Sequence, residues 1–187
     1  MKVVFLDIDG VMNSANRFKQ LQSQGLLKNN PMWDLPYEDT LKALKKIIDE
    51  TGAKIVLSSS WRLTARVKEL EDVFKSYDLF IFGKTCRYVS EEEMSKMDFD
   101  LNMCYSCHTD KNGDKYTSDR GAEIAWWLHQ HPEVENFVIL DDESTGIEPY
   151  YKKGKNFVKT DFYNWGLTME LAEKAIYILT NKEEHHE

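Results

Sequence analysis

The chain has 187 residues, is 42% hydrophobic and 12% aromatic, and carries a formal net charge of −8 at pH 7. These values predict one soluble globular domain with a single sizeable core. The net charge argues against a general nucleic-acid or acidic-membrane binder, because such proteins present basic surfaces, but it does not exclude a local basic groove. Since no apolar run approaches the roughly 18 residues of a membrane span and no signal peptide precedes the first predicted strand, we expect no membrane segment and a cytoplasmic location.

The first predicted strand carries the most informative residues. Residues 3–11 read VVFLDIDGV, an apolar run that ends in Asp7 and Asp9 and is followed by Gly10. Such a run is typical of a buried strand, and open parallel sheets bind ligands at the carboxyl ends of their strands. Because the chain turns at Gly10, both carboxylates can reach one pocket while Ile8 packs away from it. Crowded carboxylates favour a divalent cation; a solvated pair at a strand end is the alternative.

Helices and strands alternate after this segment. A helix is predicted over 37–51, begun by Pro36 and ended by Gly52. A strand over 54–57 follows it. An apolar stripe at Leu63, Val67, Leu70 and Phe74 then predicts a second helix, and 79–82 a third strand. Later come strands over 137–140 and 156–159 and a helix over 168–180. This alternation predicts an α/β fold: a doubly wound, Rossmann-like parallel sheet with helices on both faces.

Further polar residues follow the later strands. The strand over 54–57 runs into Ser58 and Ser59, and the strand over 137–140 runs into Asp141 and Asp142. Between them, an amphipathic helix is predicted from 118 to 131, with Ser118 or Asp119 as its N-cap. Arg120 then lies at a helix N-terminus, where free N–H groups and the helix dipole already favour an anion.

This ordered set resembles the haloacid dehalogenase-like (HAD) phosphohydrolase superfamily. The matching residues are 7–11 (DIDGV) for its first motif, Ser58 for the second, Arg120 for the third, and Asp141 with Asp142 for the fourth. More narrowly, the segments LDIDGVMN, IVLSSSWR and RGAEIAWWL look like the HAD domains of Swiss Army Knife RNA-repair proteins. The third position is most often Lys in the superfamily, so Lys84, Lys111 and Lys115 remain alternatives to Arg120.

The resemblance implies a Mg²⁺-dependent phosphatase that hydrolyses a phosphomonoester through an aspartyl-phosphate. Asp7 would attack phosphorus, and Asp9 would protonate the leaving oxygen and then activate water. The expected metal site consists of Asp7, Asp9 through its backbone carbonyl, Asp141 and Asp142. Phosphate binding is expected at Ser58, Ser59 and Arg120, with help from Asn13 and Arg62. A helix-surface cation is the alternative for Arg62.

The expected partner is a phosphorylated small molecule, a nucleotide or an oligonucleotide end. A phosphotransferase is one alternative function, and a metal- or redox-binding module with a vestigial phosphatase site is another. Substrate, pathway and oligomeric state stay open.

Two stretches interrupt the alternation within an expected single domain of residues 1–182. Residues 12–35 lie where the superfamily carries a flap, and their Arg17, Lys19, Lys28 and Trp33 are candidates for substrate contact. Residues 83–117 have few apolar side chains and include the hairpin-turn signal Asn112-Gly113. We expect an irregular lid there rather than a true cap domain. Residues 183–187 are expected to be a flexible tail.

The second stretch also holds all three cysteines. Residues 104–108 (CYSCH) match the haem-attachment pattern, and Cys86, Cys104, Cys107 and His108 have the composition of a zinc site. Haem attachment needs an export context, whereas free thiols fit a reducing cytoplasm. Free thiols are therefore favoured, with zinc as the alternative. Asp110, Asn112 and Asp114 hint at a calcium loop but lack its closing Glu, and a solvated turn explains them better.

Overall fold

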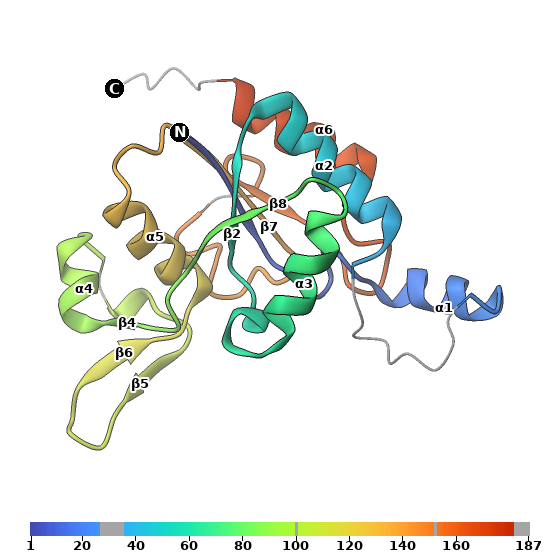
Figure 1. The fold of residues 1–187 in the computed structure, drawn as a ribbon. Helices are drawn as coiled ribbons and strands as arrows, with labels where there is room; N and C mark the ends of the chain where they lie inside the picture. Colours follow the sequence, from blue (N-terminus) through green and yellow to red (C-terminus); the bar gives the residue numbers. More distant parts are fainter. Residues whose placement is uncertain (27–35, 100, 152, 182–187) are drawn as a thin grey trace.

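The fold is built on a five-stranded parallel sheet with the strand order β3-β2-β1-β7-β8 (Figure 1). The computed structural model describes residues 1–26, 36–99, 101–151 and 153–181. The strands are β1 (Lys2–Leu6), β2 (Lys54–Leu57), β3 (Ile81–Lys84), β7 (Asn136–Asp141) and β8 (Phe157–Lys159). The sheet and the helices on both of its faces confirm the predicted doubly wound α/β fold.

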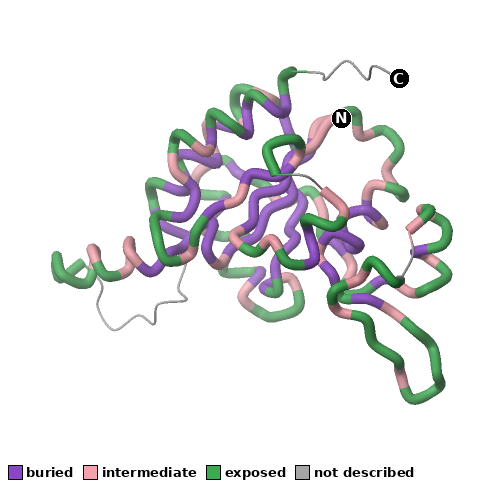
Figure 2. The backbone as a smooth tube through the Cα atoms, turned by 180° about the vertical axis from the view of Figure 1, so that it is seen from behind, coloured by how far each residue is buried: buried purple, intermediate pink, exposed green. Residues whose placement is uncertain are grey.

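Alternation along the strands divides the core into two layers. On one face, Val4 and Leu6 pack with the inner sides of α2 (Glu38–Thr51), α3 (Arg66–Lys75) and α6 (Met169–Thr180). On the other, Val3 and Phe5 pack with α5 (Arg120–Gln130). Figure 2 shows the buried residues concentrated on the sheet and on the sides of the helices that face it. Within the described residues, no helix combines the length and apolar character needed to cross a bilayer.

Several element ends differ from the sequence prediction. Strand β3 lies two residues later than expected, and Phe80 and Phe82 are exposed because β3 is an edge strand. Leu63 does not continue the stripe of α3: it ends a 3₁₀ turn, η1 (Ser60–Leu63), and its side chain is exposed. Gly52 ends α2 in the left-handed conformation, as its position predicted.

The segment at 12–35 contains a helix that the sequence analysis did not identify, α1 (Ala15–Ser23), which projects from the body of the domain (Figure 1). Its helical pattern is weak, since only Ala15 is buried. Arg17 pairs with Asp39 of α2 at 3.2 Å, and Lys19 is exposed. Lys28 and Trp33, like the tail at 183–187, fall outside the described residues.

The insertion at 83–117 is more regular than expected. It forms a three-stranded antiparallel sheet from β4 (Val89–Ser90), β6 (Lys115–Thr117) and β5 (Cys107–Thr109), with α4 (Glu91–Lys96) and the 3₁₀ turn η2 (Leu101–Met103). Val89 and Met94 are fully buried and pack on Ala122 of α5. The sequence of the insertion suggested no core, because its few apolar residues form one only together with a residue of α5. Ser90 and Glu93 form a capping box that begins α4.

One carboxylate attaches the insertion to α5. Asp119 occupies the predicted N-cap position, but its side chain makes no cap hydrogen bond. Its two oxygens instead accept hydrogen bonds from the backbone N–H groups of Tyr105 (2.7 Å) and Ser106 (2.8 Å). Gly121, two residues later, donates its N–H to the carbonyl of Gly146 at 2.8 Å. The N-terminus of α5 is therefore held from both sides.

Replacing Gly121 by Ala tests this close packing. Ala is the better helix former by about 1 kcal/mol, yet a Cβ at Gly121 would lie 2.3 Å from Tyr150 and 2.7 Å from the Gly146 carbonyl oxygen. Overpacking costs about 1–3 kcal/mol, so we expect Gly121→Ala to lower Tm, by about 2–4 °C per kcal/mol. Differential scanning calorimetry measures this shift. Gln130→Ala, at the exposed end of the same helix, is the matched control and should leave Tm nearly unchanged.

Candidate active site

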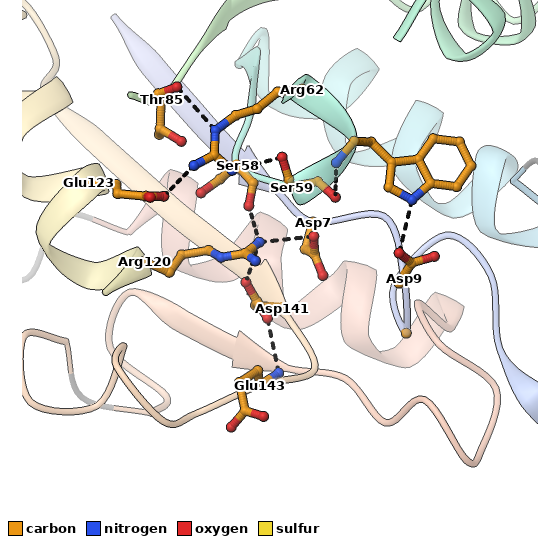
Figure 3. Close-up of polar contacts among 12 residues, drawn as sticks. Asp7, Asp9, Ser58, Ser59, Arg62, Thr85, Arg120, Glu123, Asp141 and Glu143 are labelled. Carbon is orange, nitrogen blue, oxygen red and sulfur yellow. Dashed lines mark hydrogen bonds and ion pairs between the residues drawn. The ribbon is translucent and has the colours of Figure 1, made fainter. Parts of the chain in front are cut away.

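The site lies at the carboxyl edge of the sheet, where β1, β2 and β7 end together (Figure 3). Leu6 is in register with Leu57 on one side and with Leu140 on the other. The ladder continues for one residue, because Asp7 donates its N–H to the Leu140 carbonyl at 3.0 Å and Ser58 donates to the Leu6 carbonyl at 2.8 Å. Residues that are distant in sequence are thereby brought together at this edge, as the sequence predicted.

Three carboxylates form the centre of this edge. Oxygen atoms of Asp7, Asp141 and Asp142 all lie within 4.8 Å of one another. Burial, with the charge of Asp7 acting in the same direction, raises the pKa of Asp142 to about 6. Burial also raises the pKa of Asp141. All ligand atoms of this cluster are oxygens, and burial disfavours their negative charge unless a cation neutralises it. Such a cluster suits a hard divalent cation such as Mg²⁺. The residues present therefore fit the metal that the sequence analysis expected.

Gly10 allows the approach of Asp142. Its φ of +78° lies in the left-handed region, and a Cβ built there would be 2.3 Å from the Asp142 carboxyl carbon. Only a glycine combines this backbone conformation with this contact. The turn after β1 therefore has the shape that the carboxylate cluster requires.

Arg120 provides the positive charge at the cluster. Its Nη1 lies 2.9 Å from Asp7 Oδ1 and 3.2 Å from Asp141 Oδ2, and it donates a hydrogen bond to the Ser58 carbonyl. Burial by itself lowers the pKa of this guanidinium, but the two carboxylates outweigh burial and raise it. Arg120 is thus a permanent cation that joins the ends of three strands, as Figure 3 shows.

The lysines considered as alternatives to Arg120 lie elsewhere. Lys84 pairs with Glu71 on the surface at 3.7 Å, and Lys115 pairs with Glu91 in the insertion at 3.8 Å. Lys111 is exposed in the turn of the β5–β6 hairpin. The residue in register with the third motif is therefore also the one that reaches the carboxylates.

Asp9 is held apart from the carboxylate cluster by two donors. Its Oδ2 accepts a hydrogen bond of 2.9 Å from Trp61 Nε1, and its Oδ1 accepts one of 2.9 Å from Asn13 Nδ2. Asn13 Oδ1 in turn accepts the N–H of Gly10 at 3.1 Å. The expected assistance by Asn13 is therefore the orientation of Asp9. The side chain of Asp9 does not join the metal cluster, so only its backbone carbonyl remains a candidate ligand.

The two serines after β2 behave differently. Ser58 Oγ is buried and makes no hydrogen bond within the described part of the chain, which leaves it available for a phosphoryl oxygen. Ser59 Oγ instead accepts the N–H of Trp61 at 3.4 Å and begins the turn η1. Ser59 therefore shapes the loop, and of the two serines only Ser58 offers an unbonded hydroxyl.

Arg62 is neither a surface cation nor a residue at the carboxylates. It is buried and donates to Glu123 (2.6 Å) and to the carbonyls of Ser59 (2.7 Å) and Cys86 (2.6 Å). Burial raises the pKa of Glu123 to about 7 and lowers that of Arg62, so burial dominates both groups. Through these hydrogen bonds, Arg62 connects η1 with α5.

Trp61 and Glu123 help to position residues of the site, Asp9 and Arg62, and the sequence analysis missed both of them. Both lie inside segments quoted for the family resemblance, but their residue types gave no signal of a role. The available clue was their proximity in sequence to Ser58 and to Arg120. Their partners, Asp9 and Arg62, come from other elements and are visible only in the fold.

The cysteine-rich part of the insertion forms no metal centre among the described residues. Among the described residues, the one group of clustered metal-ligating side chains is that of Asp7, Asp141 and Asp142 at the sheet edge. The zinc alternative at Cys86, Cys104, Cys107 and His108 is therefore not supported, and the three cysteines form no disulfide. Asp110 Oδ1 accepts the N–H groups of Asn112 (2.7 Å) and Asp114 (3.0 Å), which confirms a self-bonded turn in place of a calcium loop.

Comparison of the chain with curated proteins and with solved structures gives no significant match. A family model does match: that of the HAD domain in Swiss Army Knife RNA repair proteins, over residues 3–172. The match includes every residue of the site described above. Its polar residues stand at the strand ends and helix start where the resemblance placed them. The chain belongs to the family of HAD domains found in Swiss Army Knife RNA repair proteins.

Proposed function

We propose that this protein is a Mg²⁺-dependent phosphatase that hydrolyses a phosphomonoester through an aspartyl-phosphate on Asp7. Membership of the HAD family suggests a phosphohydrolase-type function. The observation that carries the proposal is the position of Asp7, which lies between the Arg120 guanidinium and the carboxylates of Asp141 and Asp142. A nucleophile, a fixed cation and a set of metal ligands are the parts that phosphoryl transfer needs.

In the first step, Asp7 attacks phosphorus and the bond to the leaving oxygen breaks. Arg120 orients the Asp7 carboxylate, and it is positioned to donate hydrogen bonds to phosphoryl oxygens together with the unbonded hydroxyl of Ser58. Asp7, Asp141, Asp142 and the Asp9 carbonyl would hold Mg²⁺, which when bound neutralises charge between nucleophile and phosphate. Splitting hydrolysis into two displacements lowers the barrier of each.

Asp9 acts as general acid and then as general base. It gives a proton to the leaving oxygen in the first step, and in the second it takes a proton from the water that attacks the aspartyl-phosphate. Trp61 and Asn13 hold its two oxygens, so the carboxyl group is oriented before substrate binds. Such positioning lowers the activation barrier of well-oriented reactions by several kcal/mol, and by roughly 7–11 kcal/mol at the limit.

We propose a nucleotide or a nucleic-acid end as the preferred substrate, with a small phosphorylated metabolite as the alternative. The description of the matched family, which refers to RNA repair, supports this choice. Net charge of −8 argues against binding along a nucleic-acid backbone. Recognition of one terminal phosphate with its nearest nucleotide does not require a basic surface.

Metal dependence is the direct test of the proposed function. We expect phosphate release from an aryl phosphate with Mg²⁺ and none after exhaustive EDTA treatment, because Arg120 offers one positive charge to three carboxylates, which without the metal repel a phosphate dianion. Activity should return when Mg²⁺ is added back. A colorimetric phosphate assay measures this. Full turnover in the presence of EDTA would contradict the proposal.

The two lead carboxylates should differ in their roles. Asp7→Asn removes the nucleophile and should abolish turnover, a cost of several kcal/mol of barrier at about 1.4 kcal/mol per tenfold in rate. Asp9→Asn should still form the aspartyl-phosphate when the leaving group is good, but should hydrolyse it slowly. Intact-mass spectrometry after a brief reaction with an aryl phosphate measures the trapped adduct. Near-normal turnover by Asp7→Asn would show that the nucleophile is another residue.

Arg120 should be essential, whereas the surface lysines should not. Arg120→Ala leaves Asp7 and Asp141 without their cation, and losing a buried charge partner costs about 3–5 kcal/mol. We therefore expect kcat/KM to fall by roughly two to four orders of magnitude, with partial recovery in Arg120→Lys. Lys84→Ala and Lys115→Ala are the matched controls. If one of these lysine variants loses activity while Arg120→Ala keeps it, the assignment is wrong.

A further inference from the structure

A cavity of about 650 Å³ opens beside the carboxylate cluster, on the β8 side of the sheet. Asp142 and Glu143 line it on the side of the cluster, and Lys153 and Lys159 line it near β8. The rest of the wall comes from the loop between Thr160 and Thr168, including Tyr163 and Trp165, and from Leu171 of α6. None of these residues except Asp142 takes part in the proposed chemistry.

The cavity lies between the carboxylate cluster and the turn that follows Asp9. Asp142 belongs to the cluster around Asp7. On the other side, the loop is bonded to the segment that follows Asp9, since Leu167 donates its N–H to the Val11 carbonyl and Ala15 donates to the Phe162 carbonyl, both at 2.8 Å. Gly166 makes the contact close, because a Cβ there would lie 2.6 Å from the Val11 oxygen. A group attached to a phosphate at Asp7 therefore has this cavity as adjacent space.

Its lining matches a flat aromatic group joined to one phosphate. Tyr163 is 79% exposed and Trp165 44% exposed, an unusual exposure for two large aromatic side chains so close in one loop. The loop is braced, because Asp161 Oδ1 accepts the N–H of Tyr163 at 2.9 Å. Exposed aromatic rings on a fixed backbone are what stacks against nucleobases.

The charges in the cavity are nearly balanced. Lys153 and Lys159 face the acids Asp142, Glu143 and Asp161 across the same space. Lys159 is anchored by a hydrogen bond of 3.2 Å to Ser144 Oγ. Such a lining tolerates a single neighbouring phosphodiester but not a long polyanion. Thr160 adds a buried hydroxyl that makes no hydrogen bond among the described residues.

We propose that this cavity binds the terminal nucleoside of a single-stranded nucleic-acid end, with its base stacked on Tyr163 and Trp165. The next phosphodiester of the strand lies near Lys153 and Lys159. This inference rests on the proposed phosphatase function and adds to it the part of the site that selects the substrate. It also explains how an acidic protein takes a nucleic-acid end without a basic groove.

The test compares substrates with and without a base. The full chain with Mg²⁺ is assayed on β-glycerol phosphate, on nucleoside monophosphates and on short oligonucleotides with a 5′- or 3′-terminal phosphate. Trp165→Ala and Tyr163→Ala should each raise KM about tenfold for the nucleotide substrates, at nearly constant kcat, since one stacked base contributes about that much. Their effect on β-glycerol phosphate should be much smaller, and Trp165→Phe should recover most of the nucleotide KM.

Tyr177→Ala is the matched control, since Tyr177 is an equally exposed aromatic on α6 that does not line this cavity. Lys153→Ala should weaken binding of the oligonucleotide more than of the mononucleotide, and the difference should vanish at high salt. Each of these results would support the proposal.

Two results would overturn it. One is an unchanged nucleotide KM in both aromatic variants; the other is an equal loss on all substrates, which would make the loop merely structural. Failure of the proposed function is a separate result, because the wild-type protein would then hydrolyse neither β-glycerol phosphate nor an aryl phosphate. If the wild-type protein cleaves these simple esters but shows no preference for nucleotides, only the nucleoside pocket is refuted.

Discussion

The crowding of buried negative charge at the carboxyl edge of the sheet determines much of this structure. Three carboxylates approach within 4.8 Å of one another, and Asp7 and Asp141 are almost completely buried. Removing such charges from water is costly unless opposite charge compensates them. Arg120 supplies part of that compensation by contacting both buried carboxylates at once. In the proposed enzyme, a hard divalent cation would supply the remainder.

Because Arg120 must reach the cluster, the N-terminus of α5 has to be placed accurately. Several contacts have this effect: the hydrogen bond from Gly121 to Gly146, the hydrogen bonds that Asp119 accepts from the insertion, and the buried Arg62–Glu123 pair. Two of these contacts involve charged groups that are expensive to bury. They connect α5 to the insertion and to η1. The insertion at 83–117 is therefore joined to the helix that carries Arg120, and its small sheet is part of the support of the site.

The two acidic groups of the first motif owe their separate roles to different partners. Asp7 faces a cation and two carboxylates, which suits a nucleophile that works beside a metal. Asp9 is held by an indole N–H and an amide, which suits a group that moves protons. The two residues are separated only by Ile8, whose side chain packs in the core on one face of the sheet. One short turn at a strand end thus presents two carboxylates to two different environments.

The sequence by itself determined the sheet, most of its elements and the polar residues at its carboxyl edge. Alternating apolar strands and amphipathic helices fix this architecture locally, and parallel strands bring their carboxyl ends to one edge whatever lies between them. Asp7, Ser58, Arg120 and Asp141 could therefore be placed together in advance. The predicted element boundaries differ from the observed ones where the local apolar pattern was ambiguous. Leu63, for example, fits the apolar stripe of the predicted helix, but it lies in a 3₁₀ turn.

Only the tertiary structure decided which neighbours complete these residues. Trp61 bonds to a residue 52 positions away and Arg62 to one 61 positions away, and no local pattern encodes such pairs. The small core of the insertion depends on Ala122 of α5, so the segment seemed too polar to fold when considered alone. The cavity beside Asp142 likewise needs the loop after β8 to pack on the turn after β1. The spacing of apolar residues shows which side of a helix or strand faces the core. Contacts between side chains that are distant in sequence depend instead on how the helices and strands pack together.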